Sequence, residues 1–221
     1  LVNETPHATQ TTLTYKNQHS AVNYGFEMEW RKSLGIIADE LKNFSLYGNA
    51  AIIWSEIKTF QKIKNPDFKP DKPTDAPQYI DVVQSLKRPL IGQSPYIVNA
   101  GLAYQSKYFG TNISFNRSGY RSYIVSTPSA TEFQRPRSLL DLQLSSRILK
   151  QKAEIKLNIS NILNTADEYY TNPNSWSVDY SSSDPFKRTK GTDNYEPDLG
   201  DLLRYRVKYG RTYNLSFTYN F

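Results

Sequence analysis

The stretch YRVKYGRTYNLSFTYNF, residues 205–221, decides the fold class of this chain. Its odd positions are bulky or aromatic, except for Arg211, and its even positions are polar, charged or glycine. Side chains alternate across a β-strand, so one face of such a strand is apolar and the other is polar. Globular strands usually have about five or six residues, whereas a strand that crosses a bilayer needs about 9–11. The stretch therefore predicts one long strand of a transmembrane β-barrel.

Six segments upstream show the same alternation of bulky and polar residues. They are residues 22–32, 44–55, 96–104, 109–118, 139–148 and 153–162. Little of the chain has a 3.6-residue period, so helices are not expected. With the terminal stretch, the pattern predicts an all-β fold of seven antiparallel strands within residues 21–221.

The connections between these segments alternate between short and long. Residues 105–108 and 150–152 are short turns, whereas residues 56–95, 119–137 and 163–204 form long loops. Outer-membrane barrels have short periplasmic turns and long extracellular loops. We therefore expect the bacterial outer membrane as the location, with the C-terminus on the periplasmic side and residues 1–20 as an extracellular loop or arm.

Seven strands are too few and of the wrong parity for a complete barrel. Bacterial single-chain barrels have an even number of strands, and a sheet edge exposed to lipid is not viable because its backbone groups stay unpaired. We therefore expect this chain to be the C-terminal portion of a larger barrel whose remaining strands lie elsewhere.

The composition agrees with a barrel and excludes several other classes. The chain has 221 residues, no cysteine, 14% aromatic residues and a mean hydropathy of -0.63. Without cysteine there is no disulfide or thiolate metal site. No apolar run approaches the roughly 20 residues of a membrane helix. The net charge of +6 is spread in mixed sign along the chain, so we expect no nucleic-acid partner.

Catalytic and metal chemistry find little support in the residues. The two histidines, His7 and His19, both lie in the N-terminal arm, so the strands lack a catalytic base, and we expect neither an enzyme nor a cofactor. The loop 163–204 contains eight carboxylates but lacks the spacing of a calcium loop, and we interpret it as a solvated acidic loop with no metal site. The eight are Asp167, Glu168, Asp179, Asp184, Asp193, Glu196, Asp198 and Asp201.

Aromatic residues fall into two groups. Those near strand ends match the girdles that barrels place at both membrane interfaces: Tyr24, Trp30, Trp54, Tyr96, Tyr104 and Phe221. Those in the long loops are the candidates for contact with a ligand or partner: Tyr79, Tyr123, Tyr170, Trp176, Tyr180 and Phe186. Packing between neighbouring loops is the alternative role for this second group.

Several motifs resemble outer-membrane barrels and one of their families. The terminal strand, with Tyr213, Leu215, Phe217, Tyr219 and Phe221 at alternate positions, resembles the C-terminal signature that the barrel-assembly machinery reads. YGFEMEWRK (24–32), LNISNILN (157–164) followed by Tyr169 and Tyr170, and RPLIGQSPY (88–96) resemble TonB-dependent receptors of the carboxypeptidase-regulatory-like, SusC-like branch.

This resemblance implies a 22-stranded barrel with an N-terminal plug that imports a scarce nutrient, such as an oligosaccharide, a peptide or a metal chelate. It also implies as partners the outer-membrane lipid, TonB acting through the plug, and a surface lipoprotein lid. The chain has no counterpart of the plug. Two rival functions remain: a structural or assembly barrel whose loops bind a partner protein, and a soluble β-sandwich binding module.

Overall fold

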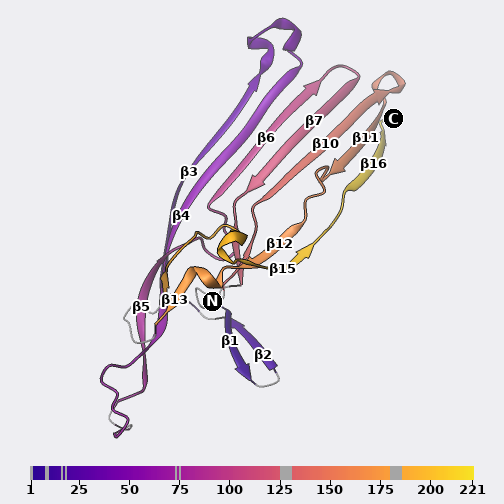
Figure 1. Cartoon of the computed structure of the whole chain (residues 1–221). Helices are drawn as coiled ribbons and strands as arrows, with labels where there is room; N and C mark the ends of the chain where they lie inside the picture. The colour runs from indigo at the N-terminus through magenta and orange to yellow at the C-terminus, as the bar shows by residue number, and fades with distance from the viewer. Residues whose placement is uncertain are drawn as a thin grey trace.

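The computed structural model describes residues 2–7, 10–15, 17, 19–72, 74, 76–124, 131–179 and 186–221. Its largest element is an eight-stranded sheet in the order β16-β11-β10-β7-β6-β4-β3, with β5 paired to β4 (Figure 1). All of its pairings are antiparallel. The strands are β3 (Ser20–Ser33), β4 (Phe44–Lys64), β5 (Tyr79–Lys87), β6 (Tyr96–Gln105), β7 (Phe109–Ser118), β10 (Arg137–Ile148), β11 (Ala153–Ser160) and β16 (Thr212–Tyr219).

The predicted all-β antiparallel class is confirmed, and each predicted strand has a counterpart in this sheet. The predicted loop 56–95 is wrong in its first part, because β4 continues to Lys64 and pairs with the additional strand β5. The alternation does not stop at Trp54: Ile57, Thr59 and Ile63 are buried on one side of the extended strand. The chain thus forms a long hairpin where a loop was expected.

The predicted loops 119–137 and 163–204 are also partly wrong, because they contain a second sheet. It has four strands in the order β15-β12-β9-β8: β8 (Arg121–Ile124), β9 (Glu132–Gln134), β12 (Asp167–Thr171) and β15 (Leu202–Val207). This order repeats the order β16-β11-β10-β7 of the large sheet, and each short strand adjoins its long neighbour in sequence. The second sheet therefore extends four strands of the first beyond an interruption.

The interruption divides the predicted strand 205–221 into β15 and β16. Gly210 takes a left-handed conformation between them, with φ of 77°, which favours glycine because it has no Cβ. Asn161, also left-handed, lies beside this point and donates through Nδ2 to the carbonyls of Thr165 and Gly210 at 3.2 and 2.9 Å. Its Oδ1 accepts the Thr165 N–H at 2.9 Å. Asn161 thus links the β11–β12 connection to the β15–β16 connection, at the point where the pairing between these two chain segments is interrupted.

Short elements complete the fold. β13 (Trp176–Val178) pairs with β14 (Phe186–Arg188), and 3-10 turns occur at η1 (Leu34–Ile36), η2 (Asp39–Leu41), η4 (Leu149–Gln151), η5 (Pro173–Ser175) and η6 (Pro197–Leu199). In the arm predicted for residues 1–20, β1 (Val2–His7) pairs with β2 (Gln10–Tyr15). Among the described residues, helices long and apolar enough for a membrane span do not occur.

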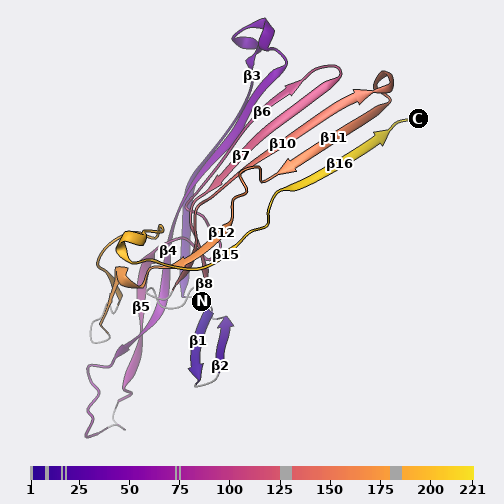
Figure 2. The same cartoon turned by 45° about the vertical axis from the view of Figure 1, so that its right-hand side comes forward.

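The two ends of the large sheet differ. The short connections β6–β7 and β10–β11, together with the C-terminus, lie at one end (Figures 1 and 2). The long hairpin β4–β5 and the four-stranded sheet lie at the other end. We call that second sheet, with residues 172–179 and 186–201, the cap. The predicted grouping of short turns at one end of the strands is therefore present.

The large sheet stays open and has one layer. β3 and β16 form its two edges, and within the described residues no pairing joins them into a closed barrel. The buried apolar side chains of the described residues lie mostly outside its middle: Ile57 and Ile63 are on the β4 extension, Phe133 and Tyr170 are in the cap, and only Ala153 lies near the short turns. The core of the chain is thus the cap, while the sheet exposes both faces.

Candidate functional site

One face of the large sheet is apolar across all its central strands. Directly paired residues share a face, and one such row runs Leu46, Leu102, Ile113, Leu142, Ile159 and Tyr213 from β4 to β16. Large apolar side chains on this face are strongly exposed, including Phe26 at 65% and Leu215 at 73%. A continuous apolar surface of this kind needs a partner, since monomeric soluble proteins rarely expose one.

Aromatic residues border this apolar face at both ends. Near the short turns, Phe44, Tyr104 and Phe109 form a row with ring centroids 4.8 and 6.3 Å apart. Near the cap, Tyr24 and Trp54 stack at 5.8 Å. Phe44 and Trp54 are ten residues apart on β4, which spans about 34 Å along the strand and about 24 Å in height at a tilt of about 45°. The apolar band of an outer-membrane barrel is about 25 Å tall.

The polarity of β4 reverses just beyond Trp54. On the apolar face, Glu56 and Lys58 follow Trp54 at alternate positions. On the opposite face, Ile57 and Thr59 become buried at 2% and 1% exposure. Charged residues therefore interrupt the apolar face beyond Trp54, where the strand enters the β4–β5 hairpin, and Phe60 paired with Val83 is exposed further along it.

The opposite face of the large sheet is polar and is organised by asparagines. The Nδ2 of Asn116 donates to Asn99 Oδ1 at 2.5 Å, and the Nδ2 of Asn99 donates to Asn49 Oδ1 at 2.6 Å. We call these three residues the amide ladder. On the same face the Tyr47 hydroxyl donates to Asn112 Oδ1 at 2.8 Å, and its ring covers Gly101, where a Cβ would overlap it.

The cap encloses an aromatic cluster. Phe133 stacks on Tyr170 at 5.6 Å, and Tyr120 and Tyr195 pack against them edge-on at 6.0 and 5.2 Å. The Tyr170 hydroxyl donates to the Asp193 carbonyl. Burial, and then the nearby Asp193 carboxylate, raise the pKa of Tyr120 and Tyr170 above the tyrosine range, so both hydroxyls stay protonated and act as donors.

The carboxylates of the cap are mostly paired or buried, so the predicted solvated acidic loop is wrong for them. Glu168 pairs with Arg135 and Arg206, and Asp193 pairs with Arg188. Asp201 is 7% exposed, and burial raises the pKa of its carboxyl above the usual aspartate value. Sequence spacing missed the pairs of Glu168 because Arg135 and Arg206 are 33 and 38 residues away, whereas Arg188 and Asp193 lie in the same predicted loop.

The predicted contact residues of the loops separate into different environments. Tyr170 is fully buried and Trp176 is half-buried beneath the Arg188 guanidinium, 4.4 Å from its ring centroid, so these two pack within the cap. Tyr79 and Tyr123 are exposed at 51% and 52%, with Tyr123 against Tyr169 at 5.0 Å. Tyr180 and the side chain of Phe186 lie outside the described residues.

The residues predicted as an assembly signal all lie on or beside the edge strand β16. Tyr213, Leu215, Phe217 and Tyr219 point to the apolar face and are exposed, and Phe221 follows the strand, fully exposed, with its ring 5.1 Å from that of Tyr219. Among the residues that the structure describes, their strand pairs on one side only, with β11. An unpaired edge that carries exposed aromatic residues is suited to pairing with another strand.

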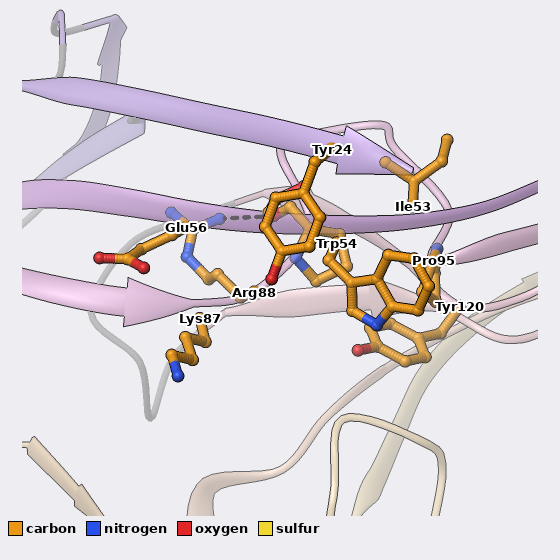
Figure 3. Close-up of a pocket in the computed structure, with 10 residues that line it drawn as sticks. Tyr24, Ile53, Trp54, Glu56, Lys87, Arg88, Pro95 and Tyr120 are labelled. Carbon is orange, nitrogen blue, oxygen red and sulfur yellow. Dashed lines mark hydrogen bonds between the residues drawn. The ribbon is translucent and has the colours of Figure 1, made fainter. Parts of the chain in front are cut away.

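A cavity that the sequence analysis missed lies where β4 changes its neighbour from β6 to β5. We call it the fork cavity; its volume is about 180 Å³, and its lining includes Tyr24, Trp54, Glu56, Lys87, Arg88 and Tyr120 (Figure 3). Figure 3 shows Arg88, Glu56 and Tyr24 around the cavity, with the hydrogen bond of Arg88 as a dashed line. The segment RPLIGQSPY contained a signal for this cavity, because its first residue, Arg88, directly follows the exposed end of β5.

The segment after Arg88 is held firmly, so the fork cavity has a fixed wall. The Oε1 of Gln93 accepts hydrogen bonds from the Ser55 hydroxyl at 3.1 Å and the Leu90 N–H at 3.2 Å. The Ile53 N–H donates to the Pro95 carbonyl at 2.9 Å. The cavity is therefore bounded by strands β3, β4 and β5 and by a connection that is hydrogen-bonded to β4.

The metal-ligating residue types do not gather into a site among the residues that the structure describes. Among them there is no group of three histidine, cysteine or acidic residues placed to hold a metal ion. His19 contacts the Ser20 hydroxyl at 3.4 Å and packs on Phe60, while the side chain of His7 is not among those described. Comparison with models of protein families, with curated proteins and with solved structures found no match.

Proposed function

We propose that the large sheet is part of the wall of an outer-membrane β-barrel and that the chain is the C-terminal barrel portion of a TonB-dependent receptor. The observation that carries the membrane proposal is the apolar face bounded by aromatic rows ten residues apart. A one-layer sheet with an uncovered apolar face does not satisfy the two-layer architecture of a soluble domain. Lipid would cover this face, and the amide-rich face would border the lumen.

The two open edges support a larger barrel. β3 and β16 each leave one side without a strand partner in the described sheet, and an unpaired edge in lipid costs several kcal/mol per backbone group. Further strands of the barrel would pair with both edges. In this proposal the assembly signal on β16 guides that closure, and the C-terminus lies on the periplasmic side with the short turns.

The transport proposal rests on the motifs that resemble TonB-dependent receptors. The cap would capture a nutrient at the cell surface, an oligosaccharide, a peptide or a metal chelate, and a surface lipoprotein would cover it. A plug contacted by TonB would then open the lumen. The polar face supports passage of such solutes, since its amides and hydroxyls both donate and accept hydrogen bonds.

Uptake assays test the transport proposal. Deletion of the gene should abolish growth on one scarce nutrient, and a proton uncoupler should abolish uptake of that nutrient in the parent strain. Normal growth on every nutrient tested, together with loss of a surface protein complex, would contradict transport.

That second outcome would favour a structural barrel whose cap binds a partner protein. The self-packed cap with exposed Tyr123 on β8, together with exposed Tyr79 on the β4–β5 hairpin, gives this alternative its support. Co-purification of one defined surface protein, lost on Tyr123→Ala and retained on Tyr108→Ala at the opposite end of the sheet, would distinguish it.

A further inference from the structure

The fork cavity holds a cation that lacks a carboxylate partner. Arg88 is half-buried, and the hydrogen bond that its guanidinium makes, from Nη1 to the Pro89 carbonyl at 3.0 Å, is to its own neighbour in sequence. In the described part of the chain, no carboxylate lies within 4 Å of it. Burial lowers the pKa of Arg88, and Asp193 opposes this only from a distance. A partly buried guanidinium without an anion is costly, which points to an external one.

The charges around Arg88 indicate how much negative charge the cavity accepts. Lys87 adds a second cation at the cavity wall, and Glu56 adds one anion, so the three groups sum to +1 (2 minus 1). The Glu56 carboxylate is engaged by the Ser85 hydroxyl at 2.5 Å. This balance suits a singly charged group such as a phosphodiester, and the planar guanidinium binds two oxygens of such a group at once.

The aromatic wall indicates what is attached to that anion. Tyr24 and Trp54 stack beside the cavity and remain 64% and 49% exposed, at the point where charged residues interrupt the apolar face. Phe26 and Ile52 are opposite each other one step further along that face and are also exposed. A ligand whose charged group enters the cavity thus has an apolar surface beside it for a hydrocarbon chain.

We propose that the fork cavity binds the phosphodiester headgroup of an anionic lipid, with Arg88 and Lys87 on the phosphate and Tyr24 and Trp54 against the first part of the acyl chain. The lipid source rests on the proposed membrane location of the apolar face. The anion site itself rests only on the cavity and its charges.

Binding measurements in detergent test this inference. The protein, purified as the cell makes it in a maltoside detergent, is titrated by calorimetry with lysophosphatidylglycerol, with lysophosphatidylcholine and with inorganic phosphate. We expect the anionic lipid to bind more tightly than the zwitterionic one. Arg88→Gln should weaken that binding at least about tenfold, since a charge-assisted hydrogen-bond pair is lost.

Arg147→Gln is the matched control. Arg147 is exposed at the short-turn end of β10, and the substitution removes the same charge far from the cavity. It should leave the affinity unchanged. If Arg88→Gln fails to fold by circular dichroism, Lys87→Gln on the exposed rim serves instead and should weaken binding severalfold.

Three results would overturn the proposal: equal affinity for the two lipids, equal affinity of the parent and the Arg88→Gln protein, or Arg88-dependent binding of inorganic phosphate without any preference for the lipid. The last would assign a free-phosphate site and reject the lipid. Since binding is measured in detergent, a negative result leaves the membrane proposal untouched, and that proposal is tested separately by the substitution at Leu142 described below.

Discussion

Replacing Leu142 by arginine tests whether lipid covers the apolar face. Leu142 lies in the row from Leu46 to Tyr213, six residues from Ile148 at the short-turn end of β10. Six residues span about 20 Å along the strand and about 14 Å in height at a tilt of about 45°, close to the middle of a band about 25 Å tall. Arginine at the midplane costs about 2–4 kcal/mol, which corresponds to a factor of about 30 to 1,000 in an equilibrium constant.

Gln143 provides the control for this substitution. It is the next residue of the same strand, and it pairs with Asn112 and Asn158 on the polar face. Gln143→Arg therefore adds the same side chain at nearly the same height, but toward water. We expect Leu142→Arg to lower the fraction of protein that resists urea extraction from outer membranes at least tenfold, and Gln143→Arg to leave it nearly unchanged.

The alternative of a water-exposed apolar face makes a different prediction. A surface substitution in water usually changes stability by within about 0.5 kcal/mol, so both variants would then behave alike. Equal extraction of the two variants would refute the facing argument, and with it the membrane location. A protein that fractionates without membranes and without detergent would refute it more directly and would favour the soluble β-sandwich module.

Three further substitutions test the junction, the polar face and the cap. Asn161→Gly keeps a residue that tolerates the left-handed conformation but removes the hydrogen bond to Gly210. It should lower the free energy of unfolding, measured by urea denaturation, by about 1–3 kcal/mol. An unchanged urea midpoint would show that this hydrogen bond does not stabilise the junction. Gly101→Val should displace the Tyr47 ring and lower stability by about 1–3 kcal/mol, whereas the same change together with Tyr47→Ala should recover part of that loss. Because the native carboxyl of Asp201 has a raised pKa, the native state holds its proton more tightly than the unfolded state does. The cap therefore loses stability as the pH rises from the usual aspartate pKa through the raised one. Asp201→Asn should flatten this pH dependence of stability, measured by hydrogen exchange of residues 189–201, and a slope equal to that of the parent protein would count against the argument.

The sequence predicted the large sheet well because a half-exposed strand records its two faces in alternate residues. The even positions from Phe44 to Trp54 are apolar or glycine, although Ala51 and Ile53 are apolar at odd positions, and the strand is present with the predicted facing. The row through Leu142 likewise has the predicted neighbours on one face. The grouping of short turns followed from the same pattern, but strand length did not in every case, since β4 continues to Lys64 and residues 205–221 are divided between two strands.

The cap could not be predicted in this way, because its residues are fixed by partners distant in sequence. β9 has only three residues and is ordered by Tyr169 and Tyr170 on one side and by β8 on the other. Tyr170 resembled a surface aromatic in sequence but is the centre of the cap core. The sequence did not predict the interruption at Gly210, because the alternation of apolar and polar residues continues across it although the backbone leaves the extended conformation there. Arg88 was missed for a similar reason, since its unpaired state depends on which carboxylates the fold leaves far away.

The amide ladder helps to fix the register of neighbouring strands, which the alternation of apolar and polar residues alone does not determine. A strand that slips by two residues keeps every side chain on its proper face, so the apolar face does not oppose such an error. The same slip of β6 against β4 would bring Asn99 opposite Tyr47 or Ala51 in place of Asn49 and would break the row of donors. Each amide in the row donates in the same direction, so reversing one would set two oxygens or two NH₂ groups face to face. The three asparagines thus distinguish the native register of the two pairings β4–β6 and β6–β7 from registers shifted by two residues.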